Sequence, residues 1–315
     1  MVLYLHYLFI LFFIYAGGNL KNFKPSGSST LLLATLIWSS SFVILKRTLD
    51  NIPVLWTLSM RFLIAAAVIA VFASRRLAKI DLEHLKCGIA MGFLLFMAYV
   101  FQTYGLDRTT PGKNAFLTDV YCILVPFMAW ISTGKRPDKF NISSALMCLV
   151  GIGLVSLDND FSIGIGDGLT LIGGIFYALH IIVTAKSAWG HDVVILTFLQ
   201  LSVAGILALI SATLFETFPS SIPSSSALGI AYLSVVCTAV TFFLQTYGQK
   251  HTNPSQASVI LCLESVFGTI ISAALGEEEI TAKLLTGFAL IFFSVIISET
   301  KLDFLQKRKH PKHIF

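Results

Sequence analysis

The sequence predicts an all-α integral membrane protein with ten transmembrane helices, arranged as a 5+5 inverted-topology repeat. Composition supplies the first observation, because 56% of the 315 residues are hydrophobic and 12% are charged. Soluble domains carry about 25% charged residues, so this chain lacks the polar surface that covers a water-soluble globule. The other two observations are apolar runs of membrane-spanning length and a polar motif that occurs twice. Together they favour one helical bundle in lipid.

Ten apolar segments are close to the roughly 20 residues that a helix needs to cross the hydrocarbon. Lipid offers no partners to backbone polar groups, so these segments are expected to be helices. They span residues 30–46, 53–73, 87–106, 113–133, 141–157, 168–186, 192–214, 227–248, 257–275 and 283–299. An earlier apolar stretch, residues 3–17, is left outside the core. It is compatible with an extra transmembrane segment, a signal or a mis-called start.

A repeated motif divides the chain into two halves. Six of the ten positions in residues 102–111 are identical to those in residues 245–254, including the run Gln-Thr-Tyr-Gly and a final proline. Each copy ends one apolar segment and leads into the next, which indicates a duplicated unit. Five crossings separate Gly105 from Gly248, and an odd number places them on opposite sides of the membrane. This is the inverted repeat that secondary transporters use.

The distribution of lysine and arginine predicts the orientation. With residues 18–29 in the cytoplasm, sixteen of these side chains face the cytoplasm and five face outside, as the positive-inside rule requires. The cytoplasmic set is Lys21, Lys24, Arg75, Arg76, Lys79, Lys86, Lys135, Arg136, Lys139, Lys186, Lys250, Lys301, Lys307, Arg308, Lys309 and Lys312. The outside set is Lys46, Arg47, Arg108, Lys113 and Lys283. We therefore expect a multi-pass protein of the cytoplasmic membrane, with both ends of the ten-helix core in the cytoplasm.

The expected organisation has four parts. Residues 1–29 form an N-terminal hydrophobic extension and basic linker, and residues 30–160 form the first repeat with helices one to five. Residues 161–300 form the second repeat with helices six to ten, and residues 301–315 form a basic cytoplasmic tail. The glycine-containing stretch 158–167 is interpreted as a flexible linker, because it lies between the two halves. Its glycine spacing does not match a dinucleotide fingerprint, so no phosphate-binding role is expected.

The cysteines are interpreted as buried structural thiols, since all lie in apolar segments and none has the pair spacing of a metal site. They are Cys87, Cys122, Cys148, Cys237 and Cys262. No metal and no cofactor are therefore expected. The net charge of +5 comes with no basic-aromatic patch, so no nucleic-acid partner is expected either.

Several stretches carry a family resemblance. They are Leu36–Phe42 in the first helix, Arg61–Phe62 in the second, Asn114–Thr118 and Val125–Pro126 in the fourth, Ala178–His180 in the sixth, and Leu263–Phe267 with Gly276–Glu278 at the ninth. Their order and spacing resemble the drug/metabolite transporter superfamily, specifically its EamA-like ten-helix family. The resemblance covers nearly everything from Thr30 to Glu299. It implies a 5+5 inverted-repeat carrier for small metabolites, often an exporter.

Two positions depart from the family pattern. Ser265 stands where proline is usual, so the break that the family shows in helix nine is expected to be softened. Asp119 stands where a small residue is commoner, which makes the expected substrate route more acidic.

Four ionisable residues lie inside the apolar segments, where each costs at least about 2.5–3.5 kcal/mol on insertion scales. Glu264 is interpreted either as a cavity carboxylate that binds a substrate cation or a proton, or as a structural tie to Arg61 or a helix end. Asp119 either meets substrate from outside or is hydrated at the vestibule. His180 is either hydrogen-bonded between helices or a protonation switch. Arg61 is expected to be structural, by snorkelling or by binding a helix C-terminus or carboxylate.

Polar and aromatic residues on helices one, three, four, six, eight and nine are predicted to line a central substrate site. The predicted set is Trp38, Tyr99, Gln102, Asn114, Thr118, Tyr121, His180, Thr241, Gln245 and Glu264. Asn114, Thr118 and Tyr121 have i, i+4, i+7 spacing and so form one stripe on their helix. Packing between helices is the alternative role for the uncharged members. Glu264, Asp119 and His180 are the candidates for proton coupling.

The sequence thus favours a secondary transporter, expected to export small metabolites such as amino acids or their derivatives by alternating access. Its expected partners are that metabolite, the lipid bilayer and coupling protons, and its oligomeric state stays open. No ATP-binding lysine motif is visible. The alternatives are an intramembrane enzyme that acts on lipid or a lipid-linked substrate, or a passive channel. The hydrolase and metalloprotease motifs that would support an enzyme do not occur.

Overall fold

The computed structural model describes residues 26–134, 136, 138–156, 164–276 and 281–300, and this part of the chain is helical with no strand. The helices are α2 Gly27–Trp38, α3 Ser41–Leu49, α4 Val54–Leu77, α5 Leu82–Asp107, α6 Pro111–Thr118, α7 Tyr121–Thr133, α8 Lys139–Ser156, α9 Ile165–Ala188, α10 Val193–Phe215, α11 Ser224–Ser234, α12 Thr241–Lys250, α13 Pro254–Leu261, α14 Leu263–Ala274 and α15 Ala282–Thr300. A π-helical turn, Val235–Val240, joins α11 to α12.

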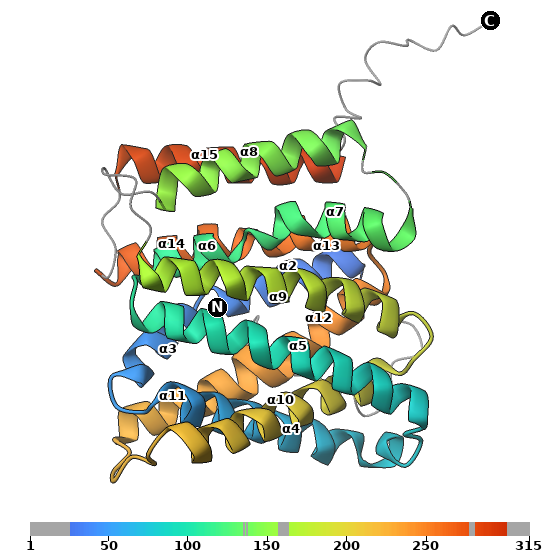
Figure 1. Cartoon of the computed structure of the whole chain (residues 1–315), viewed down its shortest axis with the longest axis vertical. Coiled ribbons are helices and arrows are strands. Elements are labelled where there is room, and N and C mark those ends of the chain that lie inside the picture. Colours follow the sequence, from blue (N-terminus) through green and yellow to red (C-terminus); the bar gives the residue numbers. More distant parts are fainter. Residues whose placement is uncertain (1–25, 135, 137, 157–163, 277–280, 301–315) are drawn as a thin grey trace, which may run out of the picture.

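The helices form a bundle in which they run roughly side by side (Figure 1). At one side α8 packs against α15, and at the opposite side α4 packs against α10 and α11. Between these layers lie α2, α5, α9 and α12, of which α5 packs on α9 and α2 on α12. The interior of the bundle is therefore built from helices of both halves of the chain.

Each of the ten apolar segments coincides with one helix or with two helices in succession. Among the residues that the structure describes, eight helical stretches are long and apolar enough to cross a membrane. The other two segments contain shorter apolar helices, Ile142–Gly151 and Ala282–Ser294. The chain is therefore a multi-pass membrane protein, as the composition of the sequence predicts.

Four of the membrane segments are interrupted near their middle. The first breaks at Ser39–Ser40, the fourth at Asp119–Val120 and the ninth at Cys262, and the eighth contains the π-helical turn Val235–Val240. Interrupted helices leave backbone groups without their usual partners, and in membrane proteins such groups occur where they contact other protein groups or a cavity. These interruptions therefore identify the middle of the bundle as the place to look for a site.

Helix nine has a one-residue interruption at Cys262, and the expected softening of this break stays a prediction. Although Ser265 replaces the usual proline, α13 ends at Leu261 and α14 starts at Leu263. The Ser265 hydroxyl donates a 2.9 Å hydrogen bond to the carbonyl of Cys262. A side-chain hydroxyl thus satisfies a backbone acceptor at the interruption, so the break does not need a proline.

The repeated motif has a local structural reason. In both copies the final proline is the first residue of a helix, Pro111 in α6 and Pro254 in α13, where a missing N–H costs nothing. The preceding residues cap these helices, since Thr110 Oγ1 accepts from Lys113 N at 3.3 Å and Asn253 Oδ1 accepts from Gln256 N at 2.8 Å. The motif therefore specifies the start of a helix in each half.

The linker prediction needs one correction. Residues 165–167 belong to the first turn of α9, where Asp167 Oδ2 accepts a 3.1 Å hydrogen bond from the backbone N–H of Gly164. A carboxylate in the first turn of a helix stabilises that turn, so the end of the expected linker is helical. The predicted N-terminal extension up to residue 25, the linker residues 158–163, Glu277, Glu278 and the tail 301–315 lie outside the described residues.

The glycines of the two motifs allow close helix contacts. A Cβ atom on Gly105 would lie against Thr170 Oγ1 and 2.8 Å from the carbonyl oxygen of Gly166 in α9. A Cβ atom on Gly248 would lie 2.6 Å from Leu31 Cγ in α2. The helices that carry these glycines, α5 and α12, end at opposite ends of the bundle (Figure 1). A glycine thus permits a close contact between two helices at each end of the bundle.

The Gly105→Ala variant is expected to lower the free energy of unfolding by about 1–3 kcal/mol, because the added methyl group has no space beside α9. The matched control is Gly153→Ala in α8, where nothing lies within 4 Å of the added Cβ atom. That change is expected to leave stability unchanged or raise it by about 1 kcal/mol, since alanine favours helix. Thermal unfolding in detergent measures both, and equal stabilities would contradict the packing argument.

Candidate functional site

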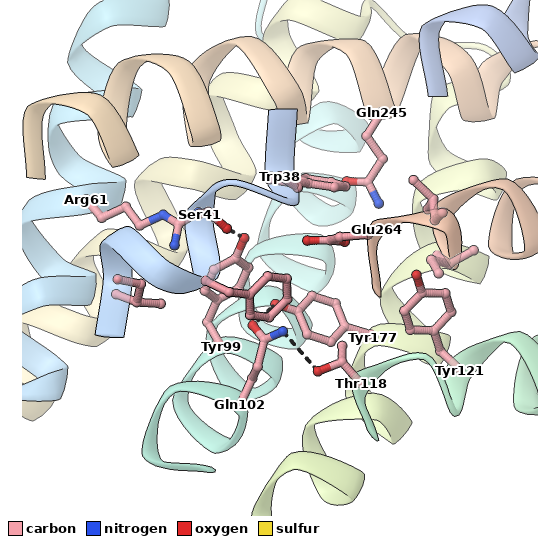
Figure 2. A pocket seen from close by; sticks show the side chains of 14 residues that line it. Trp38, Ser41, Arg61, Tyr99, Gln102, Thr118, Tyr121, Tyr177, Gln245 and Glu264 are labelled. Atoms are coloured by element: carbon pink, nitrogen blue, oxygen red, sulfur yellow. Dashed lines mark hydrogen bonds between the residues drawn. The ribbon is translucent and has the colours of Figure 1, made fainter. Parts of the chain in front are cut away.

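A small cavity lies in the middle of the bundle, at the interrupted helices. It encloses about 30 Å³, which is room for about one water molecule. Figure 2 shows the polar and aromatic side chains that surround it. The lining residues are Trp38, Ser41, Phe42, Leu45, Arg61, Tyr99, Gln102, Thr118, Tyr121, Tyr177, Ile181, Gln245, Leu261 and Glu264.

Three helix interruptions border this cavity. In each case a lining residue ends the helix before the break and another lies in the first turn after it. The pairs are Trp38 and Ser41, Thr118 and Tyr121, and Leu261 and Glu264. The breaks therefore let both ends of a divided helix turn side chains toward one point, which a continuous helix does less readily.

Glu264 is the carboxylate at this site. Its side chain points into the space beside Trp38 and Gln245 (Figure 2). Within the part of the chain that the structure describes, no hydrogen bond or ion pair to this carboxylate is formed. The neighbouring Gln245 is 3% exposed, and its Oε1 atom also has no hydrogen-bond partner. Gln245 is thus a buried polar group left unsatisfied, which is unusual in proteins, and the half-buried Glu264 carboxylate lies beside it.

Arg61 supplies a cation on the other side of the cavity. It is 1% exposed, and its guanidinium donates to Thr238 Oγ1 at 2.6 Å, to the Cys237 carbonyl at 3.2 Å and to Tyr99 Oη at 3.4 Å. The guanidinium also lies 4.9 Å from the centroid of the Tyr99 ring. It pairs with no carboxylate among the described residues. The expected snorkelling is therefore wrong, and Arg61 is instead held inside the bundle by α5 and the π-helical turn.

A hydrogen-bonded chain fixes the polar floor of the cavity. Gln102 Nε2 donates to Thr118 Oγ1 at 3.0 Å, and Tyr177 Oη donates to Gln102 Oε1 at 2.8 Å. Thr118 Oγ1 in turn donates to the carbonyl of Asn114 at 2.8 Å. Because each hydroxyl has an acceptor, these side chains keep one geometry and connect α5, α6 and α9.

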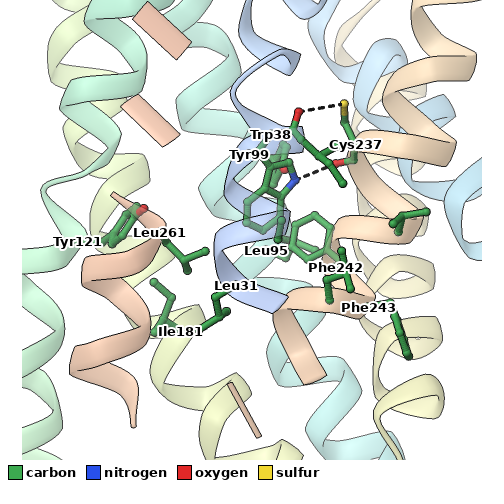
Figure 3. Packing of buried hydrophobic residues seen from close by; sticks show 14 of the residues in the cluster. Leu31, Trp38, Leu95, Tyr99, Tyr121, Ile181, Cys237, Phe242, Phe243 and Leu261 are labelled. Carbon is green, nitrogen blue, oxygen red and sulfur yellow. Dashed lines mark hydrogen bonds between the residues drawn. The ribbon is translucent and has the colours of Figure 1, made fainter. Parts of the chain in front are cut away.

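Aromatic rings form the walls. Trp38 donates from Nε1 to the Cys237 carbonyl at 2.8 Å, and its ring packs on Phe242 with centroids 5.2 Å apart (Figure 3). The ring of Tyr99 lies 5.6 Å from that of Tyr177, in an edge-to-face arrangement. Aromatic faces attract cations, so these walls suit a cationic or amphipathic ligand.

Seven of the ten residues predicted for the substrate site line this cavity. They are Trp38, Tyr99, Gln102, Thr118, Tyr121, Gln245 and Glu264. Asn114 and Thr241 are fully buried beside it, where Asn114 Nδ2 donates to Thr170 Oγ1 at 2.7 Å and Thr241 Oγ1 donates to the Cys237 carbonyl at 2.8 Å. A role in substrate binding stays a prediction for all of them.

His180 and Asp119, the other candidates for proton coupling, lie outside the cavity lining. His180 Nε2 lies 2.9 Å from Gln200 Oε1 and 3.4 Å from Thr184 Oγ1, while Nδ1 has no partner. Asp119 is 1% exposed and its Oδ2 atom has no hydrogen-bond partner. The hydroxyl groups of Ser265 and Tyr121 lie next to this carboxyl group. Glu264 is thus the one predicted coupling residue at the cavity.

Sequence reasoning missed Tyr177 and gave Arg61 only a structural role. Tyr177 lies one helical turn before His180, so its position on the same face of α9 was a usable signal. It also lies 139 positions after Trp38, and Ile181 lies 139 positions after Phe42. All four residues line the cavity. Comparison of α2 and α3 with α9 would therefore have predicted both residues.

Comparisons with known proteins agree with this architecture. The EamA-like transporter family matches residues 25–157 and again residues 164–300. An uncharacterized transporter from Archaeoglobus fulgidus is 32% identical over 267 residues, which cover 85% of this chain and 83% of that protein. The uncharacterized transporter YoaV from Bacillus subtilis is 22% identical over 276 residues, covering 85% and 94% of the two chains. A solved crystal structure of a protein has a TM-score of 0.70 at 17% identity, and covers 88% of this chain and 99% of that chain.

Proposed function

Because this chain belongs to the EamA-like transporter family, we propose that it is a secondary carrier which exports small amphipathic metabolites, such as amino acids or their derivatives, by alternating access. The observation that carries this proposal is the central cavity, where Glu264 has no partner among the described residues and Arg61 faces it from the other side. An unpaired carboxylate inside a membrane protein is costly unless it acts on a ligand or a proton.

The lining chemistry matches a small zwitterion with an apolar part. A ligand carboxylate would pair with the guanidinium of Arg61, and a ligand ammonium would pair with Glu264 and the ring faces of Trp38 and Tyr99. Gln245 offers an amide with an unpaired oxygen. Phe42, Leu45, Ile181 and Leu261 supply the apolar surface. The cavity holds about one water molecule in its present form, so binding requires the bundle to open.

The proposed architecture is a 5+5 inverted repeat of ten helices, with residues 30–160 and 161–300 as its halves. Its support is that lining residues occur at equivalent positions of the two halves. Gln102 and Gln245 are 143 positions apart, and so are Tyr121 and Glu264. In such a repeat, each half exchanges roles with the other, which opens one central site alternately to the two sides.

Contacts at the two ends of the bundle suggest the direction in which the structure is closed. At the end predicted to face outside, Lys113 Nζ and Asp167 Oδ2 form a 2.9 Å ion pair between α6 and α9. At the end predicted to face the cytoplasm, a second cleft of about 350 Å³ lies beside Lys186, Trp189 and Lys250. In the proposed cycle this form is closed toward the outside and begins to open toward the cytoplasm, where export starts.

The proposed energy source is a proton that binds Glu264. A proton and a substrate ammonium would compete for the same carboxylate, because each neutralises its charge. Protonation from the outside would then release the substrate there, and release of the proton to the cytoplasm would prepare Glu264 for the next substrate. Coupling of this kind needs no ATP-binding motif, and none is visible in the sequence.

Counterflow in proteoliposomes tests the proposed function. Vesicles that contain the full chain are preloaded with unlabelled amino acids and then given a panel of labelled ones. A carrier is expected to accelerate labelled uptake of at least one amino acid or derivative above the rate in protein-free vesicles. Flux that does not saturate would instead indicate a channel, and a chemically altered product would indicate an enzyme. Reporter tags after Gly105 and Gly248 that reach the same side of the membrane would contradict the inverted repeat.

A further inference from the structure

Three of the five cysteines meet at one point, although the sequence shows no metal-like spacing. Cys122 comes from α7, Cys148 from α8, and Cys262 from the interruption between α13 and α14. Their Sγ atoms all lie within 4.8 Å of one another, and those of Cys122 and Cys148 are 2.8 Å apart. Each side chain is at most 3% exposed. This thiol cluster lies outside the cavity lining.

A carboxylate lies beside the thiol cluster. Asp119 is 1% exposed, its Oδ2 atom has no hydrogen-bond partner, and it is close enough to interact electrostatically with all three cysteines. Its backbone carbonyl also accepts a weak 3.9 Å hydrogen bond from Cys262 Sγ. A carboxylate oxygen is a suitable fourth ligand for a tetrahedral site. Asp119 would have to move toward the sulfur atoms to supply it, because its carboxylate does not lie within 4.8 Å of all three.

From this arrangement we infer that Cys122, Cys148, Cys262 and Asp119 form a binding site for a thiophilic divalent d¹⁰ cation such as Zn²⁺ or Cd²⁺. Bonds of about 2.3 Å in a tetrahedral site place sulfur ligands about 3.8 Å apart. The three thiols already lie near that separation, so small side-chain movements bring them to one ion. Soft thiolate ligands select such cations over Mg²⁺ or Ca²⁺.

Charge balance supports a divalent ion. Thiols must lose protons to act as strong ligands, and binding therefore releases protons. A doubly charged cation offsets two of the negative charges that the deprotonated ligands bring, which lowers the cost of burying them. A monovalent ion would neutralise only one ligand.

The site would connect separate parts of the bundle. Cys122 directly follows Tyr121, and Cys262 lies two residues before Glu264. Tyr121 and Glu264 both line the cavity. An ion bound to the cluster would hold α7, α8 and the α13–α14 interruption together. The bound ion would then restrict movement of the segment that carries Glu264.

The test is a Cd²⁺ titration of the purified, fully reduced chain in lipid nanodiscs, followed by the near-ultraviolet absorption that Cd²⁺–thiolate bonds produce. One Cd²⁺ per chain is expected, together with a rise in the unfolding temperature. The variants Cys122→Ser, Cys148→Ser and Cys262→Ser should each weaken binding at least about tenfold, and Asp119→Asn should weaken it less. The matched control is the double variant Cys87→Ser/Cys237→Ser, which should bind Cd²⁺ as tightly as the unchanged chain.

Several results would overturn the inference. They are an absorption that is unchanged in a variant with Cys122, Cys148 and Cys262 all replaced by serine, binding lost in the Cys87→Ser/Cys237→Ser control, or a Cys122–Cys148 disulfide that persists under reducing conditions. Unfolding temperatures without Cd²⁺ show whether each variant is folded. If the serine variants do not fold, Cd²⁺ binding is compared between the folded Asp119→Asn variant and the Cys87→Ser/Cys237→Ser control. The site is rejected if the two bind Cd²⁺ with equal affinity and neither shows the Cd²⁺–thiolate absorption.

Discussion

Glu264→Gln is expected to abolish the pH dependence of transport and to reduce uptake at least about tenfold, while membrane insertion is unchanged. Glutamine has nearly the same shape but neither binds a proton nor pairs with an ammonium group. Loss of one charge-assisted interaction of about 1.5–3 kcal/mol accounts for a tenfold effect or more. The measurement is uptake into proteoliposomes at acidic and alkaline pH, with the amino acid that shows the strongest counterflow.

The same variant separates a functional carboxylate from a structural one. Since Glu264 has no hydrogen bond or ion pair in the described structure, its replacement should not lower the unfolding temperature. The matched control is Glu216→Gln at the end of α10. Glu216 accepts from Leu55 N at 2.9 Å and from Tyr104 Oη at 2.8 Å, so this change should cost stability but keep the pH dependence. Unaltered pH dependence in Glu264→Gln would remove Glu264 from the mechanism.

Arg61→Met is expected to lower both stability and transport. The change removes the hydrogen bonds to Thr238, Tyr99 and the Cys237 carbonyl, and leaves the charge of Glu264 without a nearby cation. We expect a loss of about 2–4 kcal/mol in the free energy of unfolding and transport close to that of protein-free vesicles. Arg61→Lys should recover part of the transport, because it restores the charge but not the forked donors.

The control for Arg61 is Arg76→Met. Arg76 forms a 3.4 Å ion pair with Asp192, and the two side chains are 29% and 35% exposed. Pairs of this kind contribute roughly 0–1 kcal/mol, so this variant should stay close to the unchanged chain in unfolding temperature and uptake. If Arg61→Met and Arg76→Met lose similar amounts of stability and uptake, the proposed role of Arg61 at the cavity is contradicted.

The sequence predicted the membrane segments and much of the cavity for physical reasons. Apolar length specifies where helices cross lipid, and the capped prolines Pro111 and Pro254 specify where two of them begin. Glu264 and Gln245 were predicted because a polar side chain in an apolar helix needs a partner or a ligand. These signals are local, so one sequence is enough to find them.

Other features depend on contacts that no local signal specifies. The interruption at Ser39–Ser40 contains neither proline nor glycine, so the residues at the break give no local signal of it. The role of Arg61 follows from a π-helical turn, Val235–Val240, in a distant segment. The three clustered cysteines come from separate helices, so their spacing along the chain could not indicate their proximity.

The π-helical turn has a mechanical consequence. The Cys237 carbonyl within it accepts hydrogen bonds from Trp38 in α2, Arg61 in α4 and Thr241 in α12. Any displacement of this carbonyl alters the hydrogen bonds of both Trp38 and Arg61, because the two side chains share one acceptor atom. Tightening the wide turn into a regular α-helix would therefore change the contacts of α2 and α4 at the same time, so this one oxygen couples the two helices to the shape of the turn.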